Sequence, residues 1–282
     1  MLTRRVYLFP RDAATAPPES AQLQREGWAL LRDVFSSDEV DELRREISEV
    51  YAADAPGERQ AHQVPELAEQ FRYEMFNRSA ACQTAMAHRR ILDVIEPLIG
   101  EDCHVIANTA WRNPANVEHL HGGGRWHIDA GPHIPRPAGT VWPADIPYPV
   151  FVVATHILLQ DTPVECGPTG VIPFSHTSGQ PPPSGRGDDP DLTCNGHAPV
   201  VLAARAGDVQ LFVSDVWHRR MPTAEGDAGR FFLQVHYGRR DIAQRLVPTS
   251  EANQASPAAR LRAVSKRERT LIGLHPALFY DG

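Results

Sequence analysis

Long apolar runs are missing from this 282-residue chain. No stretch reaches the roughly 18 consecutive apolar residues of a membrane-spanning helix. The apolar part of residues 1–10 is too short for the core of a secretory signal peptide. From these two absences we expect a soluble protein that stays in the cytoplasm.

Cysteine and excess positive charge are also scarce. The four cysteines, Cys82, Cys103, Cys166 and Cys194, form no CxxC pair, which argues against a zinc knuckle or a redox motif, and we expect reduced thiols. With 28 basic and 35 acidic residues the net charge is −7. Binding to nucleic acid or to an anionic membrane needs clustered Lys and Arg, so neither is expected. The expected partner is a small molecule, and the oligomeric state is not indicated.

The first hundred residues carry helical patterns. Ser36 and Glu39 form a capping-box pattern, and apolar residues then recur at three- and four-residue steps up to Val50, which predicts an amphipathic helix. Two further helices are predicted over residues 20–26 and 82–99, the second ending at Gly100.

From Cys103 onward, short apolar runs broken by Pro and Gly indicate an all-β body. Strands are expected at residues 28–31, 104–109, 125–130, 150–159, 170–173, 200–204, 209–213 and 230–237. So many short strands without helices between them favour a mainly β fold with flanking helices, a double-stranded β-helix (a cupin-like jelly roll) that holds its ligand between two sheets.

We expect residues 1–282 to form one domain. It would comprise a helical N-terminal part at about 20–100, a β-helix core at about 103–240, and a C-terminal extension at 241–282 with one or two helices. Residues 180–199 are rich in Pro, Gly, Asp and Ser, which predicts a long loop, either a mobile lid or a disordered insertion.

The pattern that carries chemistry is His127-Ile128-Asp129. Side chains two residues apart on a strand point to the same face, so His127 and Asp129 can hold one ion together. With thirteen histidines in the chain, one such pair is weak by itself. His218, just after the strand predicted at 209–213, is the best candidate for a third ligand. Two imidazoles and one carboxylate on one face of a metal leave open positions, as in non-haem Fe(II) oxygenases.

Arg230 opens a predicted strand on which Arg230, Phe232, Gln234 and His236 share one face. An arginine buried in a barrel is costly without an anionic partner, so this position predicts a bound carboxylate held by two hydrogen bonds. The alternative is an Arg230 that is exposed at the start of its strand and pairs with Asp227.

The order of these motifs resembles the phytanoyl-CoA dioxygenase family of Fe(II)- and 2-oxoglutarate-dependent oxygenases. Residues 25–35 (REGWALLRDVF) resemble its N-terminal strand, and residues 165–176 (ECGPTGVIPFSH) resemble its ENG…PGSH stretch. Residues 206–212 (AGDVQLF) resemble its GDvvlF strand. The likeness covers about residues 20–240 and weakens after that.

The resemblance implies that His127, Asp129 and His218 hold Fe(II) and that Arg230 binds the distal carboxylate of 2-oxoglutarate, with O₂ as the second co-substrate. It also implies co-substrate contacts from Asn108 and from His156, at a position where many members carry a tryptophan.

The carboxylate in the metal-binding pattern bears on the type of reaction. Related halogenases have a small residue at the position of Asp129, which leaves room for chloride. The resemblance therefore implies a dioxygenase that hydroxylates, or otherwise oxidises, a small organic molecule. We favour a step in secondary-metabolite biosynthesis, because an acyl-CoA substrate would need basic residues for its phosphates.

Several further residues near the site are candidates to face the substrate, with core packing or surface placement as the alternative for each. These are His121, Trp126, His133, Arg136, Trp142 and Trp217. We also expect His176 in a turn and His236 beside the metal ligands. Two other functions stay open at this point: a cupin-type metal enzyme that does not use 2-oxoglutarate, and a non-catalytic ligand-binding jelly roll.

Overall fold

The computed structural model describes residues 16–53, 70–115, 123–129, 131–244 and 254–275. Of the residues singled out above, His121 lies outside this set. Within the described ranges, none of the helices combines the length and the apolar character needed to span a membrane.

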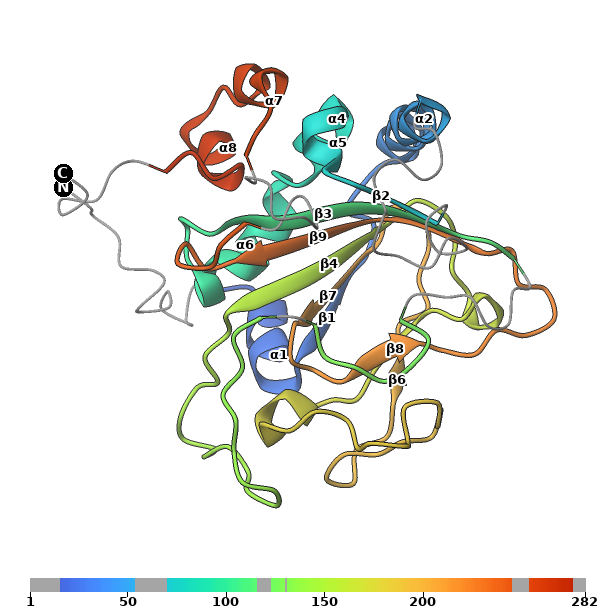
Figure 1. Cartoon of the computed structure of the whole chain (residues 1–282), viewed down its shortest axis with the longest axis vertical. Helices are drawn as coiled ribbons and strands as arrows, with labels where there is room; N and C mark the ends of the chain where they lie inside the picture. Colours follow the sequence, from blue (N-terminus) through green and yellow to red (C-terminus); the bar gives the residue numbers. More distant parts are fainter. Residues whose placement is uncertain (1–15, 54–69, 116–122, 130, 245–253, 276–282) are drawn as a thin grey trace.

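Two antiparallel sheets form the centre of the molecule (Figure 1). The large sheet has six strands in the order β1-β7-β4-β9-β3-β2, and the small sheet has three in the order β6-β5-β8. The large sheet comprises β1 (Trp28–Leu31), β2 (Phe71–Tyr73), β3 (His104–Asn113), β4 (Val152–Leu158), β7 (Val209–Val213) and β9 (Arg230–Gly238). The small sheet comprises β5 (Thr169–Val171), β6 (Val200–Val201) and β8 (His218–Arg220). This arrangement confirms the predicted mainly β fold with flanking helices.

The two faces of the large sheet have different roles. Leu233, Val235 and Tyr237 of β9 belong to the main hydrophobic core, which also contains the buried residues of the helices. The alternate residues of β9 point toward the small sheet, because side chains along a strand alternate between its faces. In Figure 1, helices α2 (Ser37–Ala53), α4 (Met75–Arg78) and α5 (Ala80–Ala85) lie on one side of the large sheet and the small sheet lies on the other.

The remaining helices are α1 (Pro18–Glu26), α6 (Arg89–Ile99), α7 (Pro257–Arg262) and α8 (Lys266–Leu271). The capping box before α2 is confirmed: the Ser36 N–H donates to Glu39 Oε2 at 2.8 Å, and the Glu39 N–H donates to Ser36 Oγ at 3.4 Å. The one or two helices expected in the C-terminal extension are also confirmed. Its α7 is tied to α5 by Gln83, whose Nε2 donates to the carbonyl of Ala259 at 2.9 Å.

The helix predicted over residues 82–99 is two helices, α5 and α6, so that prediction is wrong in its continuity. The chain turns after Ala85, and His88 then serves as the N-cap of α6, its Nδ1 accepting from the Arg90 N–H. A side chain that satisfies a free N–H at a helix start favours a new helix over a continued one.

The strand predicted over residues 125–130 is reduced to a single bridge. His127 and His218 exchange two main-chain hydrogen bonds, each 3.0 Å long. The sequence also failed to predict β2 and β8. Both have three residues, and β8 reads His-Arg-Arg, so neither shows the apolar alternation by which strands are recognised.

The cysteine prediction is confirmed, since all four cysteines are free and buried. The 180–199 loop, in contrast, has a defined course instead of disorder. Its carbonyl groups at Gly187 and Asp189 accept hydrogen bonds from the main chain and the indole of Trp126, at 2.8 and 2.6 Å. Leu192 and Cys194 of the loop are buried in a small apolar cluster with Ile172, Trp126 and Trp217.

Gly207 lies in the turn before β7, where its carbonyl accepts from the N–H groups of Val34 and Phe35, and it provides a stability test. Its φ is +89°, and an added Cβ would overlap the carbonyl oxygen of Phe35, whereas Gly185 has a similar φ of +82° with open space around it. We expect Gly185→Ala to cost about 1 kcal/mol, from backbone strain alone, and Gly207→Ala to cost at least about 2 kcal/mol more. Denaturant unfolding of both variants measures the difference. Equal losses would contradict this account.

Candidate active site

The structure brings together the three residues predicted to bind a metal. The ligand atoms of His127, Asp129 and His218 all lie within 4.8 Å of one another. The backbone fixes this arrangement: His127 and His218 are bridged across their strands, and the Asp129 N–H donates to the carbonyl of Ser214 at 2.8 Å. His218 Nε2 lies 3.6 Å from Asp129 Oδ1.

Main-chain carbonyl groups set the tautomer of both histidines. His127 Nδ1 lies 2.6 Å from the oxygen of Arg125, and His218 Nδ1 lies 2.9 Å from the oxygen of Val216. A carbonyl oxygen can only accept, so each Nδ1 carries a proton and each Nε2 keeps its lone pair in the neutral ring. Both rings therefore present Nε2 to a metal ion, as metal-binding histidines do.

Asp129 is held ionised and oriented. Burial alone would raise its pKa, but hydrogen bonds and charge interactions with His218 and His236, when these rings are protonated, outweigh burial and hold the pKa of Asp129 well below its usual range. His236 Nε2 donates to Asp129 Oδ2 at 2.9 Å. Burial, reinforced by the neighbouring His218, lowers the pKa of His127 to about 4. The ionised carboxylate and the neutral imidazole are the forms that bind a metal.

The three residues open onto a cavity between the two sheets, which we call the inner cavity, of about 180 Å³. From the large sheet, four side chains of β9 and one of the neighbouring β4 line this cavity. From the small sheet, side chains of β5 and β8 line it. Besides the three candidate ligands, its lining includes Trp111, His156, Thr169, Arg220, Arg230 and Gln234.

Arg230 lies in the inner cavity without an anionic partner. Its side chain is buried, and Nε and Nη2 both donate to the neutral Asn113 Oδ1, at 3.0 and 2.7 Å. The ion pairs of the described residues include none for Arg230, and burial, then repulsion from Arg220, holds its pKa well below its usual range. The alternative pairing with Asp227 is wrong, because Asp227 pairs with Arg220 at 3.7 Å.

These residues fit Fe(II) and a carboxylate co-substrate. Two imidazole nitrogens and one carboxylate are the donors that mononuclear Fe(II) sites use. A buried guanidinium with only a neutral acceptor is unfavourable until an anion joins it, and a carboxylate accepts two parallel hydrogen bonds from an arginine.

The two residues implied as further co-substrate contacts are placed differently. His156 lines the inner cavity, with Nδ1 3.2 Å from Thr169 Oγ1, and burial holds its pKa well below the usual range, so its ring is neutral. Asn108 is not among the lining residues. It pairs in register with Val235, on the core side of the sheet, and its Nδ2 donates to the carbonyl of Gln234 at 3.0 Å.

Trp111 takes the place on β3 that Asn108 was expected to fill. It pairs in register with Phe232, which puts it on the cavity side, and its Nε1 donates to Gln234 Oε1 at 2.8 Å. Sequence reasoning missed Trp111 because the residues of a strand cannot be assigned to a face until its partner register is known.

Most candidates for substrate contact are packed elsewhere. Trp126 and Trp217 belong to the apolar cluster beneath the 180–199 loop, as the packing alternative proposed. Arg136 lies over the ring of Trp142, which lines a separate cavity of about 490 Å³. His133 stays near the metal site.

His133 contacts the candidate metal site through its Nε2, which lies 2.9 Å from the carbonyl oxygen of Asp129. A hydrogen bond with Asp215 is the main reason why the pKa of His133 is raised. His176 lies in the turn Ser175–Ser178, as predicted.

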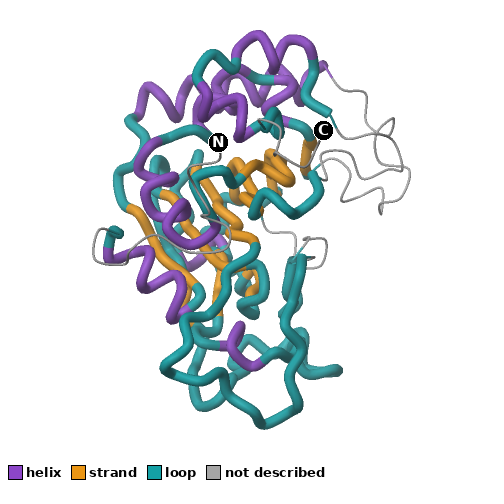
Figure 2. The backbone as a smooth tube through the Cα atoms, turned by 90° about the vertical axis from the view of Figure 1, so that its left-hand side faces the viewer, coloured by secondary structure: helices purple, strands orange, loops and turns teal. Residues whose placement is uncertain are grey.

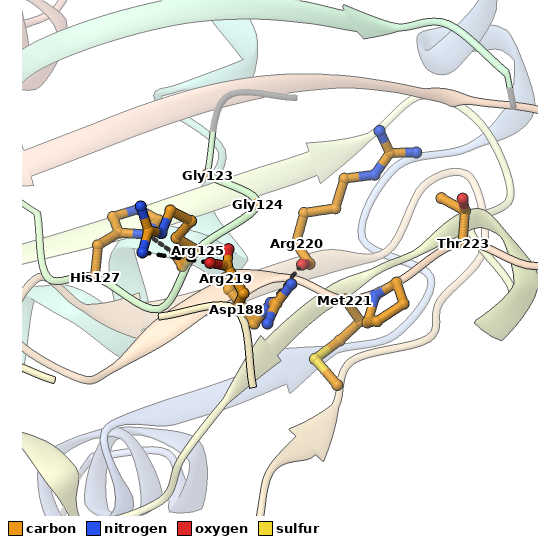
Figure 3. Close-up of a pocket in the computed structure, with 10 residues that line it drawn as sticks. Gly123, Gly124, Arg125, His127, Asp188, Arg219, Arg220, Met221 and Thr223 are labelled. Carbon is orange, nitrogen blue, oxygen red and sulfur yellow. Dashed lines mark hydrogen bonds and ion pairs between the residues drawn. The ribbon is translucent and has the colours of Figure 1, made fainter. Parts of the chain in front are cut away.

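A second, larger cavity lies beside the inner one and is called the outer cavity (Figure 3). Its volume is about 540 Å³, and both cavities share Gly123, His127, Arg219 and Arg220. The side chain of Met221 adds an apolar surface. The outer cavity is therefore the route by which a larger molecule could approach the metal site.

The fold and the site define a mononuclear non-haem iron oxygenase: a two-histidine, one-carboxylate centre between two β-sheets, with an unpaired arginine in the same cavity. The model of the phytanoyl-CoA dioxygenase family matches residues 23–222, and the chain belongs to this family. It is accordingly a dioxygenase that depends on Fe(II) and 2-oxoglutarate, which sets aside the cupin-type and the non-catalytic alternatives.

Solved structures support the fold. The epimerase SnoN in complex with Fe³⁺, α-ketoglutarate and nogalamycin RO is 19% identical, with a TM-score of 0.61, over 86% of this chain and 93% of SnoN. EctD from S. alaskensis in its apo form is 19% identical, with a TM-score of 0.60, over 95% and 89%. HygX from Streptomyces hygroscopicus with nickel and 2-oxoglutarate is 19% identical, with a TM-score of 0.57, over 81% and 89%. A sequence search of curated proteins found no significant match.

His236 provides a test of the metal centre that leaves its ligands in place. Its hydrogen bond orients Asp129, so we expect His236→Phe to weaken Fe(II) binding by about 10- to 100-fold, the usual effect of losing a partner behind a metal ligand. Anaerobic titration with Fe(II) measures this affinity.

The matched control is His197→Phe, because His197 is exposed and lies outside the site. We expect this variant to bind Fe(II) like the wild type. Wild-type affinity in the His236 variant would show that Asp129 needs no such support.

Proposed function

We propose that this dioxygenase hydroxylates a small organic molecule. Four residues of the inner cavity bind the iron and the co-substrate: His127, Asp129, His218 and Arg230. The observation that carries the proposal is the buried Arg230 without an anion, in the same cavity as His127, Asp129 and His218. A metal site alone would not need this cation, whereas a dicarboxylate co-substrate uses both.

In this proposal His127 and His218 bind Fe(II) through Nε2, and Asp129 binds it through a carboxylate oxygen. Once iron and 2-oxoglutarate are bound, they supply an oxygen-driven oxidation of a substrate C–H bond. Arg230 holds the distal carboxylate of 2-oxoglutarate as a fork. His156 beside it stays neutral and adds no competing charge.

The protein's own part in the reaction is orientation and exclusion of water. The metal ligands are fixed by main-chain hydrogen bonds, so little rearrangement is needed when the ion binds. The inner cavity is large enough for a small dicarboxylate, while the substrate would lie in the outer cavity. Asp129 fills the position that a chloride would need, which favours hydroxylation over halogenation.

The substrate class is a proposal of its own. The epimerase SnoN, from nogalamycin biosynthesis, has the same fold, and this supports a role in secondary-metabolite biosynthesis. The single-domain organisation, the location in the cytoplasm and the lack of nucleic-acid or membrane partners stay predictions.

Replacing Arg230 tests the proposed co-substrate. We expect Arg230→Gln to raise the KM for 2-oxoglutarate by about 10- to 100-fold, because a hydrogen-bonded charge pair contributes about 1.5–3 kcal/mol. Succinate formation with Fe(II), ascorbate and candidate substrates is the measurement. The exposed Arg205→Gln is the control and is expected to behave like the wild type.

The proposal fails if the wild-type protein forms no succinate above background and also binds no 2-oxoglutarate. An unchanged KM in the Arg230 variant would reject the role of this residue and would leave the metal centre standing.

A further inference from the structure

Arg220 is a second arginine on the metal-binding face of β8. It follows His218 by two residues, so both side chains leave the strand on the same side. Arg220 is buried and lines both the inner and the outer cavity. No role for Arg220 could be predicted from the sequence.

Three acceptors hold one edge of the Arg220 guanidinium. Nε lies 3.4 Å from the carbonyl oxygen of Gly167, and Nη2 lies 3.1 Å from that of Cys166 and 3.7 Å from Asp227 Oδ2. The other terminal nitrogen, Nη1, is buried and has no hydrogen-bond partner. A terminal guanidinium nitrogen carries two N–H donors. Burying these donors without a hydrogen-bond partner is unfavourable, so a bound group that accepts from Nη1 would be stabilised.

The surroundings of Nη1 favour an anion as that acceptor. Arg220 and Arg230 line the same cavity, and repulsion from Arg220 contributes to the lowered pKa of Arg230. Among the described residues, Asp227 is the one acid that forms an ion pair with either of them. Two positive charges and one negative charge in a buried place leave a net positive charge, which a bound anion would balance.

We propose that Arg220 is a second anchor for the co-substrate: its Nη1 donates to the anionic end that Arg230 also binds. The proposal rests on the proposed use of 2-oxoglutarate. Two arginines on one carboxylate would make the inner cavity selective for a dicarboxylate over a 2-oxo acid with an uncharged end.

The exposed Arg205 is the control, because it carries the same charge and does not line either cavity. The neighbouring Arg219 does not serve as one, because it also lines the inner cavity. Its Nε donates to the carbonyl of Arg220 at 2.9 Å, and its Nη1 donates to that of Gly187 at 3.4 Å. In Figure 3 the side chains of Arg219 and Arg220 point in different directions. Arg219 thus supports the 180–199 loop.

Binding measured by calorimetry on the full-length protein loaded with Zn²⁺ tests the proposal without turnover. The ligands are 2-oxoglutarate and 2-oxopentanoate, which has the same chain length but a methyl group in place of the distal carboxylate. We expect Arg220→Gln to weaken 2-oxoglutarate by about tenfold or more and 2-oxopentanoate by less than about threefold. Arg205→Gln should leave both within about threefold.

Two results would overturn the assignment. An equal loss for both ligands would mean that Arg220 only supports the strands around Cys166, and wild-type affinity for 2-oxoglutarate in Arg220→Gln would mean that it does not touch the co-substrate. Either result leaves the proposed function intact, whereas a wild-type protein that binds no 2-oxoglutarate would remove both. Should Arg220→Gln not fold, Arg220→Lys is used, with the same loss expected for 2-oxoglutarate alone.

Discussion

The main-chain bridge between His127 and His218 is the interaction on which the active site depends. The segment from Gly123 to Asp129 belongs to neither sheet, and its position comes from hydrogen bonds to the chain around β8. Those bonds bring residues that are ninety positions apart in sequence to ligand distance. Because main-chain groups do this work, the imidazole and carboxylate groups remain available for the metal.

Charge is the second organising constraint of the interior. The site gathers one carboxylate, Asp129, and two buried guanidinium groups, Arg220 and Arg230, around one cavity. Charges interact strongly there, so a misplaced ion would be costly. A divalent ion beside Asp129 and a dianion reaching the arginines would complement this distribution of charge.

The types of residue that form the site could be predicted from the sequence more fully than the positions of those residues in the fold. The shared direction of His127 and Asp129 and the burial of Arg230 could be predicted, because the two-residue period of a strand and the cost of burying a charge can be judged from the local sequence. Asn108 was assigned to the cavity although its strand turns it to the core, and Trp111 was missed, because the register between β3 and β9 is set by contacts far apart in sequence. Arg220 escaped notice because β8 is short and polar, and the 180–199 loop looked too polar to bury Leu192 and Cys194.

The small apolar cluster beneath that loop has a consequence for how the enzyme could diversify. Trp126 and Trp217 belong to it, and each immediately precedes a metal-binding histidine, so that the two side chains of each pair leave the backbone on opposite sides. The loop thus rests on the reverse of the metal site. Substitutions at its exposed residues would alter the surface beside the site, while Leu192 and Cys194 are constrained, since a change that displaces them would disturb the packing behind the two histidines of the proposed metal site.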